Sequence, residues 1–279
     1  MTKGTSTIPW LIHNPWNLSP RGWDLSVGCS RCSAGCEHCY AATVAWIRSH
    51  QKNPKISDKY KGTIQKVDGK IDWTGGVNWE SDKLKAPLKW KPSMIFICSH
   101  SDLFHVNIDY SYVSAVMKMI ELCPQHIFVM VTKRSMRMAY YFNNRYKKPL
   151  PANLWPMVTV CNQEEADQKI PQLLSIDAKV HGISAEPLLG PLELWDYIGA
   201  EGMEGQNRLG WTIIGTESGP KRRPAEMVWL ENLALQCSGY VPTFIKQAEI
   251  AGKVVKMPEI AGQVYDQYPN DTRITTEES

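Results

Sequence analysis

Six short apolar runs recur downstream of residue 90, and their spacing constrains the fold more than any other feature of the chain. Successive runs begin about 20–35 residues apart. The segments between them have helical spacing, as expected of buried parallel strands joined by crossover helices. The sequence therefore predicts an α/β barrel. The predicted strands are Met94–Cys98, Ile127–Val131, Met157–Val160, Val180–Ser184, Trp211–Gly215 and Thr243–Ile245.

One connecting segment shows the helical pattern well, because Val113, Val116, Met117 and Ile120 fall on one face of residues 112–123. Polar side chains follow every predicted strand, and in α/β barrels the carboxyl ends of the strands converge on the active site. Loops are polar in general, so one polar cluster by itself fits an ordinary surface turn about as well as it fits an active-site position. The clusters are Ser99–Asp102, Thr132–Arg134, Asn162–Glu164, Glu186, Glu217–Ser218 and Lys246–Gln247.

The length of 279 residues, 43% of them hydrophobic, is enough for one large core. We expect a single barrel domain over residues 1–250 and a C-terminal extension over 251–279, whose polar end from Tyr268 should fray. Residues 50–76, rich in lysine and glycine, are expected to be a surface insertion. The 31 basic and 28 acidic side chains give a net charge of +3, which permits a nucleic-acid partner without requiring one.

The amino-terminal residues lack the pattern of a secretory signal, and no run approaches the roughly 18 apolar residues of a membrane span. We therefore expect a cytoplasmic protein with no membrane partner. In that reducing compartment eight cysteines are not expected to form a disulfide framework. Four of them, namely Cys98, Cys123, Cys161 and Cys237, lie apart in apolar surroundings and are expected to be buried as small hydrophobic side chains.

The other four cysteines crowd into residues 28–40, the cysteine loop, with the spacing C-x2-C-x3-C-x2-C. Structural zinc sites usually separate their two cysteine pairs by a dozen or more residues, and here the gap is three. An iron–sulfur cluster is larger than one metal ion, and a short cysteine-rich loop can surround it. The loop therefore favours a cluster over zinc or free thiols. Its cysteines are Cys29, Cys32, Cys36 and Cys39.

The spacing of Cys32, Cys36 and Cys39 resembles that of radical S-adenosylmethionine (SAM) enzymes. This resemblance implies a [4Fe–4S] cluster on three thiolates, SAM on the fourth iron, and a ring at His38 before the last cysteine. Such enzymes generate a 5′-deoxyadenosyl radical that removes hydrogen from the substrate, so the cofactor supplies the difficult chemistry. An electron donor such as flavodoxin is implied as a partner.

Over most of its length the chain also resembles a phage-associated, radical-SAM-like family of largely unknown function, whose fold would be a partial (β/α)6 TIM-like barrel. The family's pattern C-x6-C-x2-C falls on Cys29, Cys36 and Cys39. The third ligand is therefore either Cys29, favoured by this pattern, or Cys32, favoured by the general spacing. The resembling segments are Asn14–Asn17, Gly28–Cys29, Gly35–Ala41, Pro87–Trp90, Asp102–Phe104, Thr132–Arg134, Asn162–Glu164, Glu186–Pro191, Glu217–Pro220 and Phe244–Gln247.

The resemblance implies modification or rearrangement of a nucleic-acid base, as by an isomerase. The base could be a hypermodified thymidine in phage DNA, and the enzyme would then act in the host cytoplasm. Two alternatives are radical chemistry on a free nucleotide or a peptide, and repair of damaged DNA by a lyase. An alternative from another class is a zinc-stabilised nucleic-acid-binding protein without catalysis.

Within the implied site, Lys246 and Glu217 are the candidate catalytic residues. Lys246 would be a cation facing the substrate, and both residues end predicted strands. The basic run Lys221–Arg223 could meet DNA phosphates, although such runs are usually solvated. Loop acids, turns and helix caps are the competing interpretations of all these positions. The candidate cofactor-binding residues are His38, Tyr40, Ser99, Asp102, Lys133, Asn162 and Glu186.

Overall fold

The computed structural model describes residues 6–199, 207–219 and 221–273. Its main sheet has eight strands in the order β1-β6-β7-β8-β9-β10-β11-β12. Neighbouring strands are parallel from β1 to β11, and β12 is antiparallel to β11. The strands are β1 (Ser19–Trp23), β6 (Ser93–Ile97), β7 (Ile127–Thr132), β8 (Leu154–Thr159), β9 (His181–Ala185), β10 (Leu209–Gly215), β11 (Thr243–Ile250) and β12 (Lys253–Lys256).

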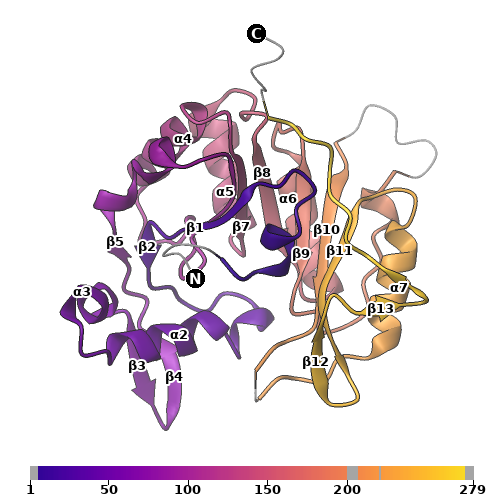
Figure 1. Cartoon of the computed structure of the whole chain (residues 1–279), viewed down its shortest axis with the longest axis horizontal. Coiled ribbons are helices and arrows are strands. Elements are labelled where there is room, and N and C mark those ends of the chain that lie inside the picture. The colour runs from indigo at the N-terminus through magenta and orange to yellow at the C-terminus, as the bar shows by residue number, and fades with distance from the viewer. Residues whose placement is uncertain (1–5, 200–206, 220, 274–279) are drawn as a thin grey trace.

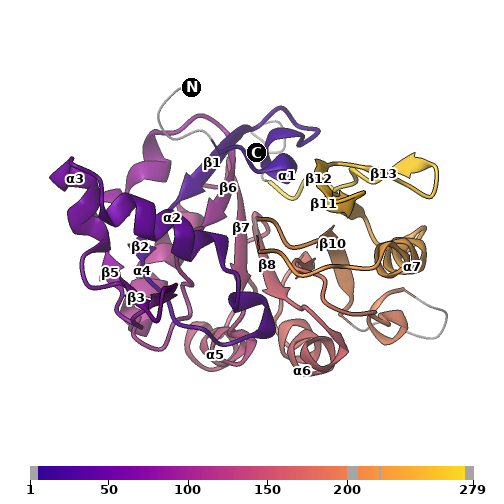
Figure 2. The ribbon, with the colours of Figure 1, turned by 90° about the horizontal axis from the view of Figure 1, so that it is seen from below.

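The sheet curls into an open barrel, with its main helices on the outer face (Figures 1 and 2). These helices are α4 (Tyr110–Glu121), α5 (Ser135–Tyr141), α6 (Gln163–Leu174) and α7 (Met227–Cys237), and α5 continues into a π-helical turn over Phe142–Tyr146. The predicted partial α/β barrel is confirmed, and α4 corresponds to the helix expected over residues 112–123. Asp109 caps α4 by accepting a hydrogen bond from the Ser111 amide at 2.7 Å.

All six predicted strands are present, and β1 adds a further parallel strand at the sheet edge. The run Ser19–Trp23 lacks an apolar pattern, and only Trp23 in it is fully buried. An edge strand beside β6 needs no continuous apolar run, because only one of its sides is hydrogen-bonded into the sheet. This strand was therefore absent from the six apolar runs.

Side chains alternate between two cores along the central strands. On β7, Ile127 and Val129 point into the barrel, whereas Phe128 and Met130 face the helices. Successive residues of a strand point to opposite sides, so both must be apolar when the sheet is covered on both faces. The four isolated cysteines are buried, as predicted for Cys98, Cys123, Cys161 and Cys237.

An aromatic layer, here called the barrel floor, fills the inner core. Trp10 of helix α1 (Pro9–Ile12) packs edge-on against Trp211 at 5.8 Å between ring centroids. Tyr268 packs on Trp16 and Trp211 and donates a hydrogen bond to the carbonyl of Trp10 at 2.9 Å. The expectation that the chain frays from Tyr268 was therefore wrong for residues 268–273, because the polar composition of this segment concealed a half-buried ring that packs on the core. Residues 274–279 of the expected extension lie outside the described residues.

The segment expected as an insertion, residues 50–76, lies outside the main sheet (Figure 1). It contains α3 (Pro54–Ser57), a 3-10 turn (Asp58–Tyr60) and the hairpin of β3 (Ile64–Val67) with β4 (Lys70–Trp73). It packs on α2 (Tyr40–Ser49), the helix after the cysteine loop. The remaining elements are β2 (Ser26–Val27), β5 (Asn78–Trp79), β13 (Glu259–Ile260), β14 (Gln263–Val264) and the 3-10 turns Ala34–Cys36, Ser81–Lys83, Ala86–Lys89 and Trp195–Tyr197.

Among the described residues, no helix has the length and apolar character that crossing a bilayer requires.

Candidate active site

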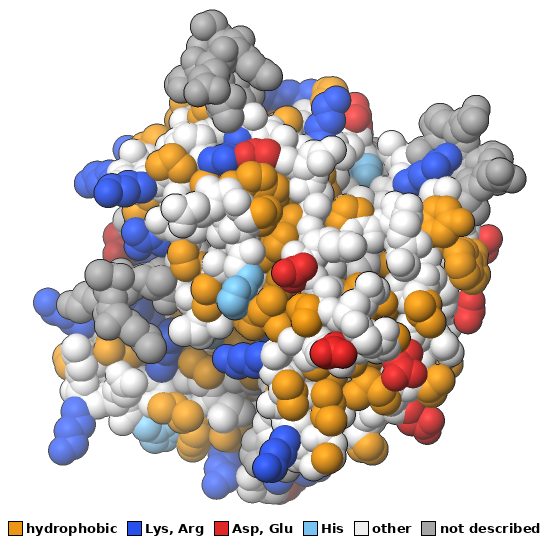
Figure 3. All heavy atoms as spheres, turned by 45° about the vertical axis from the view of Figure 1, so that its right-hand side comes forward, with side chains coloured by type: hydrophobic (Ala, Val, Ile, Leu, Met, Phe, Trp, Pro, Cys, Tyr) orange, Lys and Arg blue, Asp and Glu red, His pale blue; other side chains and the backbone are white. Residues whose placement is uncertain are grey.

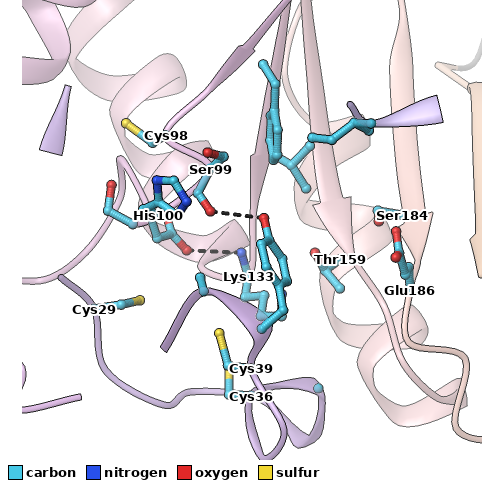
Figure 4. Close-up of a pocket in the computed structure, with 18 of the residues that line it drawn as sticks. Cys29, Cys36, Cys39, Cys98, Ser99, His100, Lys133, Thr159, Ser184 and Glu186 are labelled. Carbon is cyan, nitrogen blue, oxygen red and sulfur yellow. Dashed lines mark hydrogen bonds between the residues drawn. The ribbon is translucent and has the colours of Figure 1, made fainter. Parts of the chain in front are cut away.

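A cavity of about 670 Å³, here called the main cavity, lies at the carboxyl ends of the parallel strands. Figure 4 shows the thiols of Cys29, Cys36 and Cys39 on one side of it and Glu186 on the opposite side. Most of the residues predicted as a site meet here. Those that line the cavity are Cys29, Cys36, His38, Cys39, Tyr40, Ser99, Asp102, Lys133, Glu186, Glu217 and Lys246.

Two predicted residues do not line this cavity. Asn162 caps α6, where its side chain accepts a hydrogen bond from the Glu165 amide at 2.9 Å. This is the helix-cap interpretation that the sequence left open. Cys32 is exposed, whereas Cys29, Cys36 and Cys39 are half-buried.

The cysteine loop lies close against the strand ends at Gly35. A β-carbon on Gly35 would lie 2.5 Å from Cys161 Sγ and 3.1 Å from the ring of Pro187. Ser33 stabilises the turn that follows, because its hydroxyl accepts a hydrogen bond from the Gly35 amide at 3.2 Å. Only glycine fits here without displacing the loop from the barrel.

The thiols differ in their electrostatic surroundings. Burial, reinforced by Asp102, raises the pKa of Cys29 to about 11 against the opposing effect of Arg134. A hydrogen bond from Cys32 lowers the pKa of Cys36 to about 5, with help from the ammonium group of Lys133. Burial opposes ionisation of Lys133, but the neighbouring Cys36, Cys161 and Cys39 raise its pKa above the usual value. Lys133 therefore places a positive charge beside the thiols.

The first of three anchors joins the start of the loop to β6 and β7. Arg134 forms an ion pair with Asp102 at 2.8 Å, and both side chains are largely buried. The same guanidinium donates to the carbonyl of Ser30 at 2.9 Å and lies 3.7 Å from Cys29 Sγ. His105 lies 2.8 Å from the hydroxyl of Ser30. The start of the loop is thus held by a buried charge pair.

The carboxylate of Asp102 is occupied by other parts of the protein. Besides Arg134, it accepts hydrogen bonds from the Thr132 hydroxyl at 2.7 Å and from the amides of Phe104 and Lys133 at 2.9 and 3.2 Å. A carboxylate accepts about four such bonds. Asp102 lines the cavity, but its acceptor positions are already filled.

The second anchor comes from Glu165 in the first turn of α6. Its carboxylate accepts hydrogen bonds from the Ser33 hydroxyl at 2.5 Å and from the Ala34 amide at 3.3 Å. Lys169 forms an ion pair with the same carboxylate at 2.9 Å. The hydrogen bond from Ser33 and the charge of Lys169 outweigh burial and keep the pKa of Glu165 below its usual value.

The third anchor is Glu217 at the end of β10. It pairs with Arg223 at 2.6 Å and with His38 at 2.9 Å, and Arg223 also donates to the carbonyl of Ala34 at 3.0 Å. Burial opposes ionisation, but Arg223 and His38 lower the pKa of Glu217 overall. The basic run 221–223 is engaged internally at two positions, since Arg222 pairs with Glu249 at 2.7 Å.

The opposite wall of the cavity carries an ion pair that faces inward. Lys246 of β11 binds the carboxylate of Glu186, and the amide of Gln247 lies 3.4 Å from the same oxygen. Gly215 leaves room for this pair, because a β-carbon there would lie 3.2 Å from Glu186 Cγ. Unlike the anchors, Glu186 and Lys246 make no hydrogen bond or ion pair with the cysteine loop within the described residues, and both line the cavity.

Two residues of the site, Glu165 and Asp24, had no clear signal in the sequence. Glu165 stands next to the predicted cluster Asn162–Glu164, and nothing in the one-dimensional pattern separates it from Glu164. Asp24 follows β1, the strand without an apolar run, and accepts from the Ser99 hydroxyl at 2.7 Å. Hydrogen bonds from His100 and Ser99 outweigh burial and lower the pKa of Asp24 to about 2.

The donor set fits an iron–sulfur cluster. Among the described residues, no three cysteine, histidine or carboxylate side chains converge closely enough to hold one metal ion. A polynuclear cluster needs no such convergence, because each thiolate binds its own iron. Three half-buried thiols on one wall of a cavity satisfy that requirement.

The fold and the site define an open α/β-barrel protein with a cysteine-bearing loop fixed over the carboxyl ends of its strands. More narrowly, the chain belongs to the family described as "Protein of unknown function (DUF5131)", whose model matches residues 12–269. That description assigns no activity and mentions no phage.

Among solved structures, the chain is similar to a spore photoproduct lyase variant with a dinucleoside spore photoproduct. The TM-score is 0.40 and the sequence identity is 11%, and the match covers 85% of this chain. It spans 66% of the length of the lyase chain. Comparison with curated proteins finds no match.

Proposed function

We propose that the protein is a radical SAM enzyme whose [4Fe–4S] cluster is held by Cys29, Cys36 and Cys39. The observation that carries this proposal is the position of these thiols, half-buried on one wall of a cavity at the carboxyl ends of the strands. Cys32 is exposed and does not line the cavity, although its thiol lies within hydrogen-bond reach of Cys36, and this exposure supports Cys29 as the third ligand. When bound, the cluster and SAM supply a radical able to remove hydrogen from an unactivated C–H bond.

The chain's own residues would bind and orient SAM. Lys133 offers a positive charge beside the thiols and suits the carboxylate of SAM. Glu186 suits the ammonium or ribose hydroxyls of SAM, and the rings of Tyr40 and His38 flank the last cysteine. Tyr40 is oriented by its hydrogen bond to the carbonyl of Ser99 at 3.0 Å. In this scheme Ser99 positions Tyr40.

The anchors would act as positioning residues. Asp102 and Glu217 hold the loop, so we assign neither of them a direct contact with the reacting atoms. Lys246, which faces the cavity, is the candidate catalytic residue. Its ammonium donates a hydrogen bond to Glu186 and could donate a proton to a substrate oxygen or nitrogen during rearrangement.

The proposed substrate is a nucleic-acid base, modified or rearranged as by an isomerase, and a hypermodified thymidine in phage DNA remains the leading example. An electron donor such as flavodoxin would reduce the cluster, and the reaction would take place in the cytoplasm. Support for this class of substrate comes from the family resemblance and from the distribution of charge described in the next subsection.

Anaerobic reconstitution with iron and sulfide, followed by reduction with SAM, tests the proposal. Wild type should hold about four irons per chain and release 5′-deoxyadenosine. Cys29→Ala and Cys36→Ala should lose iron and SAM cleavage, whereas the matched loop variant Cys32→Ala should keep both. Iron loss from Cys32→Ala alone would reverse the ligand assignment. A colourless wild type with one zinc per chain would reject the cluster.

A further inference from the structure

The net positive charge of the whole chain lies in the segment 50–76, here called the arm. The arm holds six lysines and three aspartates, a net charge of +3, which equals that of all 279 residues. The rest of the chain is therefore balanced. A concentration of one sign of charge on one element of a neutral protein creates a local field that attracts the opposite charge.

Most of the arm's lysines are free to meet a partner. Within the described residues, one of the six, Lys59, makes an ion pair, with Glu80. Asp72 is occupied by Arg31, so part of the arm's negative charge is already neutralised. The lysines that are exposed and make no ion pair within this part of the chain are Lys52, Lys55, Lys61, Lys66 and Lys70. We call this group the lysine face, although its members do not all lie on one side of the arm, since the hairpin register places Lys66 and Lys70 on opposite sides of the two strands.

The arm is attached directly to the cysteine loop. Arg31 of the loop pairs with Asp72 of β4 at 2.8 Å, and the amide of Gly75 donates to the carbonyl of Cys29 at 3.1 Å. A small core of its own, which includes Tyr60 and Trp73, packs against Cys29 and Cys39. The arm is thus held in place beside the main cavity, which Trp73 helps to line.

A second cavity of about 350 Å³ connects the arm with the main cavity. It is lined by Lys59 and Tyr60 of the arm, by Lys83, and by Arg48, Asp24 and His100, the last three of which also line the main cavity. Figure 3 shows most lysine and arginine side chains of its view on the left half and most acidic ones on the right half. Three of the residues that line this second cavity, Arg48, Lys59 and Lys83, are cations, and Lys59 and Lys83 both pair with Glu80.

We propose that the lysine face binds the phosphodiester backbone of a nucleic-acid strand, so that a base of that strand enters the main cavity. This inference rests on the proposed function and deepens it, because it selects a polymer over a free nucleotide. Exposed lysines beside a cavity suit repeated phosphates, which they contact as point charges without reading sequence. An acidic peptide offers the lysines negative charge without a base to enter the cavity, and it is the competing ligand in the test.

The test measures binding of fluorescein-labelled single-stranded DNA by anisotropy, with protein as purified, between about 50 and 200 mM KCl. Wild type should bind with strong salt dependence. Changing the five lysines of the face to glutamine should reduce the slope of log K against log salt by about 2 to 3.5, at most about 0.7 per lysine. The matched control, Lys118→Gln/Lys179→Gln/Lys253→Gln/Lys256→Gln, removes exposed lysines elsewhere and should leave the slope within about 1 of wild type.

Thermal unfolding checks that the five-lysine variant is folded. If that variant does not fold, the double variant Lys66→Gln/Lys70→Gln, whose changes are confined to the hairpin, takes its place. Any of three results would overturn the inference. The salt slope could be unchanged in the arm variants, or it could fall in the control by as much as in the arm variants. Polyglutamate could also displace labelled DNA as well as unlabelled DNA does. Because this binding needs no cluster, its failure is separate from failure of the proposed function. Iron binding and SAM cleavage without DNA binding would reject the arm alone and favour a free nucleotide.

Discussion

Two groups of polar residues stand at the strand ends, and they differ in what they bind. Asp102, Glu165 and Glu217 turn toward the protein and hold the cysteine loop through paired charges. Glu186 and Lys246 pair with each other and face the cavity. Polar residues at the mouth of a barrel are therefore not all ligand contacts. The loop-holding group should control stability and cluster retention, whereas the cavity-facing group should control ligand binding.

The largest effect is expected from Asp102→Ala. Removing one partner leaves the Arg134 guanidinium buried without its counter-charge, at a cost of about 3–5 kcal/mol in the free energy of unfolding. Denaturant unfolding measures the loss. The control is Asp109→Ala, which removes an exposed helix cap and should cost about 1 kcal/mol. Equal losses in the two variants would remove Asp102 from the loop-holding group.

The next effect is a pH dependence that comes from His105. Burial and the nearby Arg134 lower the pKa of His105 to about 4 from its ordinary 6.5. Its contribution to stability is complete above pH 6.5 and is lost as the pH falls toward 4, by about 3 kcal/mol in total.

Unfolding of the metal-free protein between these pH values measures the slope. His105→Asn should flatten it, while His13→Asn, a change at an exposed histidine, should leave it as in wild type. A slope that survives in His105→Asn would show that another group titrates.

Gly35→Ala tests how tightly the loop must sit on the barrel. Its methyl group would lie 2.5 Å from Cys161 Sγ, so we expect a loss of about 1–3 kcal/mol and reduced iron retention. Gly190→Ala is the matched control, since nothing lies within 4 Å of its β-carbon position. The double variant Gly35→Ala/Cys161→Ala removes the clashing sulfur and should recover part of the iron. If the iron content does not recover, the contact with Pro187 rather than with Cys161 is what excludes a methyl group at position 35.

Glu186→Gln should have the smallest effect on stability and sharpen the contrast between the groups. Glutamine keeps an oxygen for Lys246, so the free energy of unfolding should change by less than about 1 kcal/mol. Iron content should match wild type, while the Kd for SAM should rise about tenfold. Titration calorimetry on reconstituted protein measures the Kd. Loss of iron here would place Glu186 with the loop-holding group.

The fold followed from the sequence because the six buried strands carried short, mainly apolar runs at regular intervals between Met94 and Ile245. The edge strand β1 lacked such a run, and Asp24 after it was missed together with the strand. The cysteine loop and most cavity-lining residues were also predictable, since strand ends converge in a barrel. Their partners were not, because pairs such as Glu217 with His38 join residues 179 positions apart and depend on tertiary packing.

The barrel floor has a consequence for how the molecule is assembled. Tyr268 binds Trp10 across 258 positions, and the Trp155 ring donates to Thr272 at 2.8 Å. The contact between Tyr268 and Trp10 joins residues far apart in sequence, so it forms only after the chain has been synthesised as far as Tyr268. A nascent chain that ends before residue 265 already contains the cysteine loop and all three anchors, but it lacks the Tyr268 ring of the barrel floor. Synthesis of the segment from Tyr268 to Thr272, rather than formation of the cysteine loop, therefore completes the barrel floor.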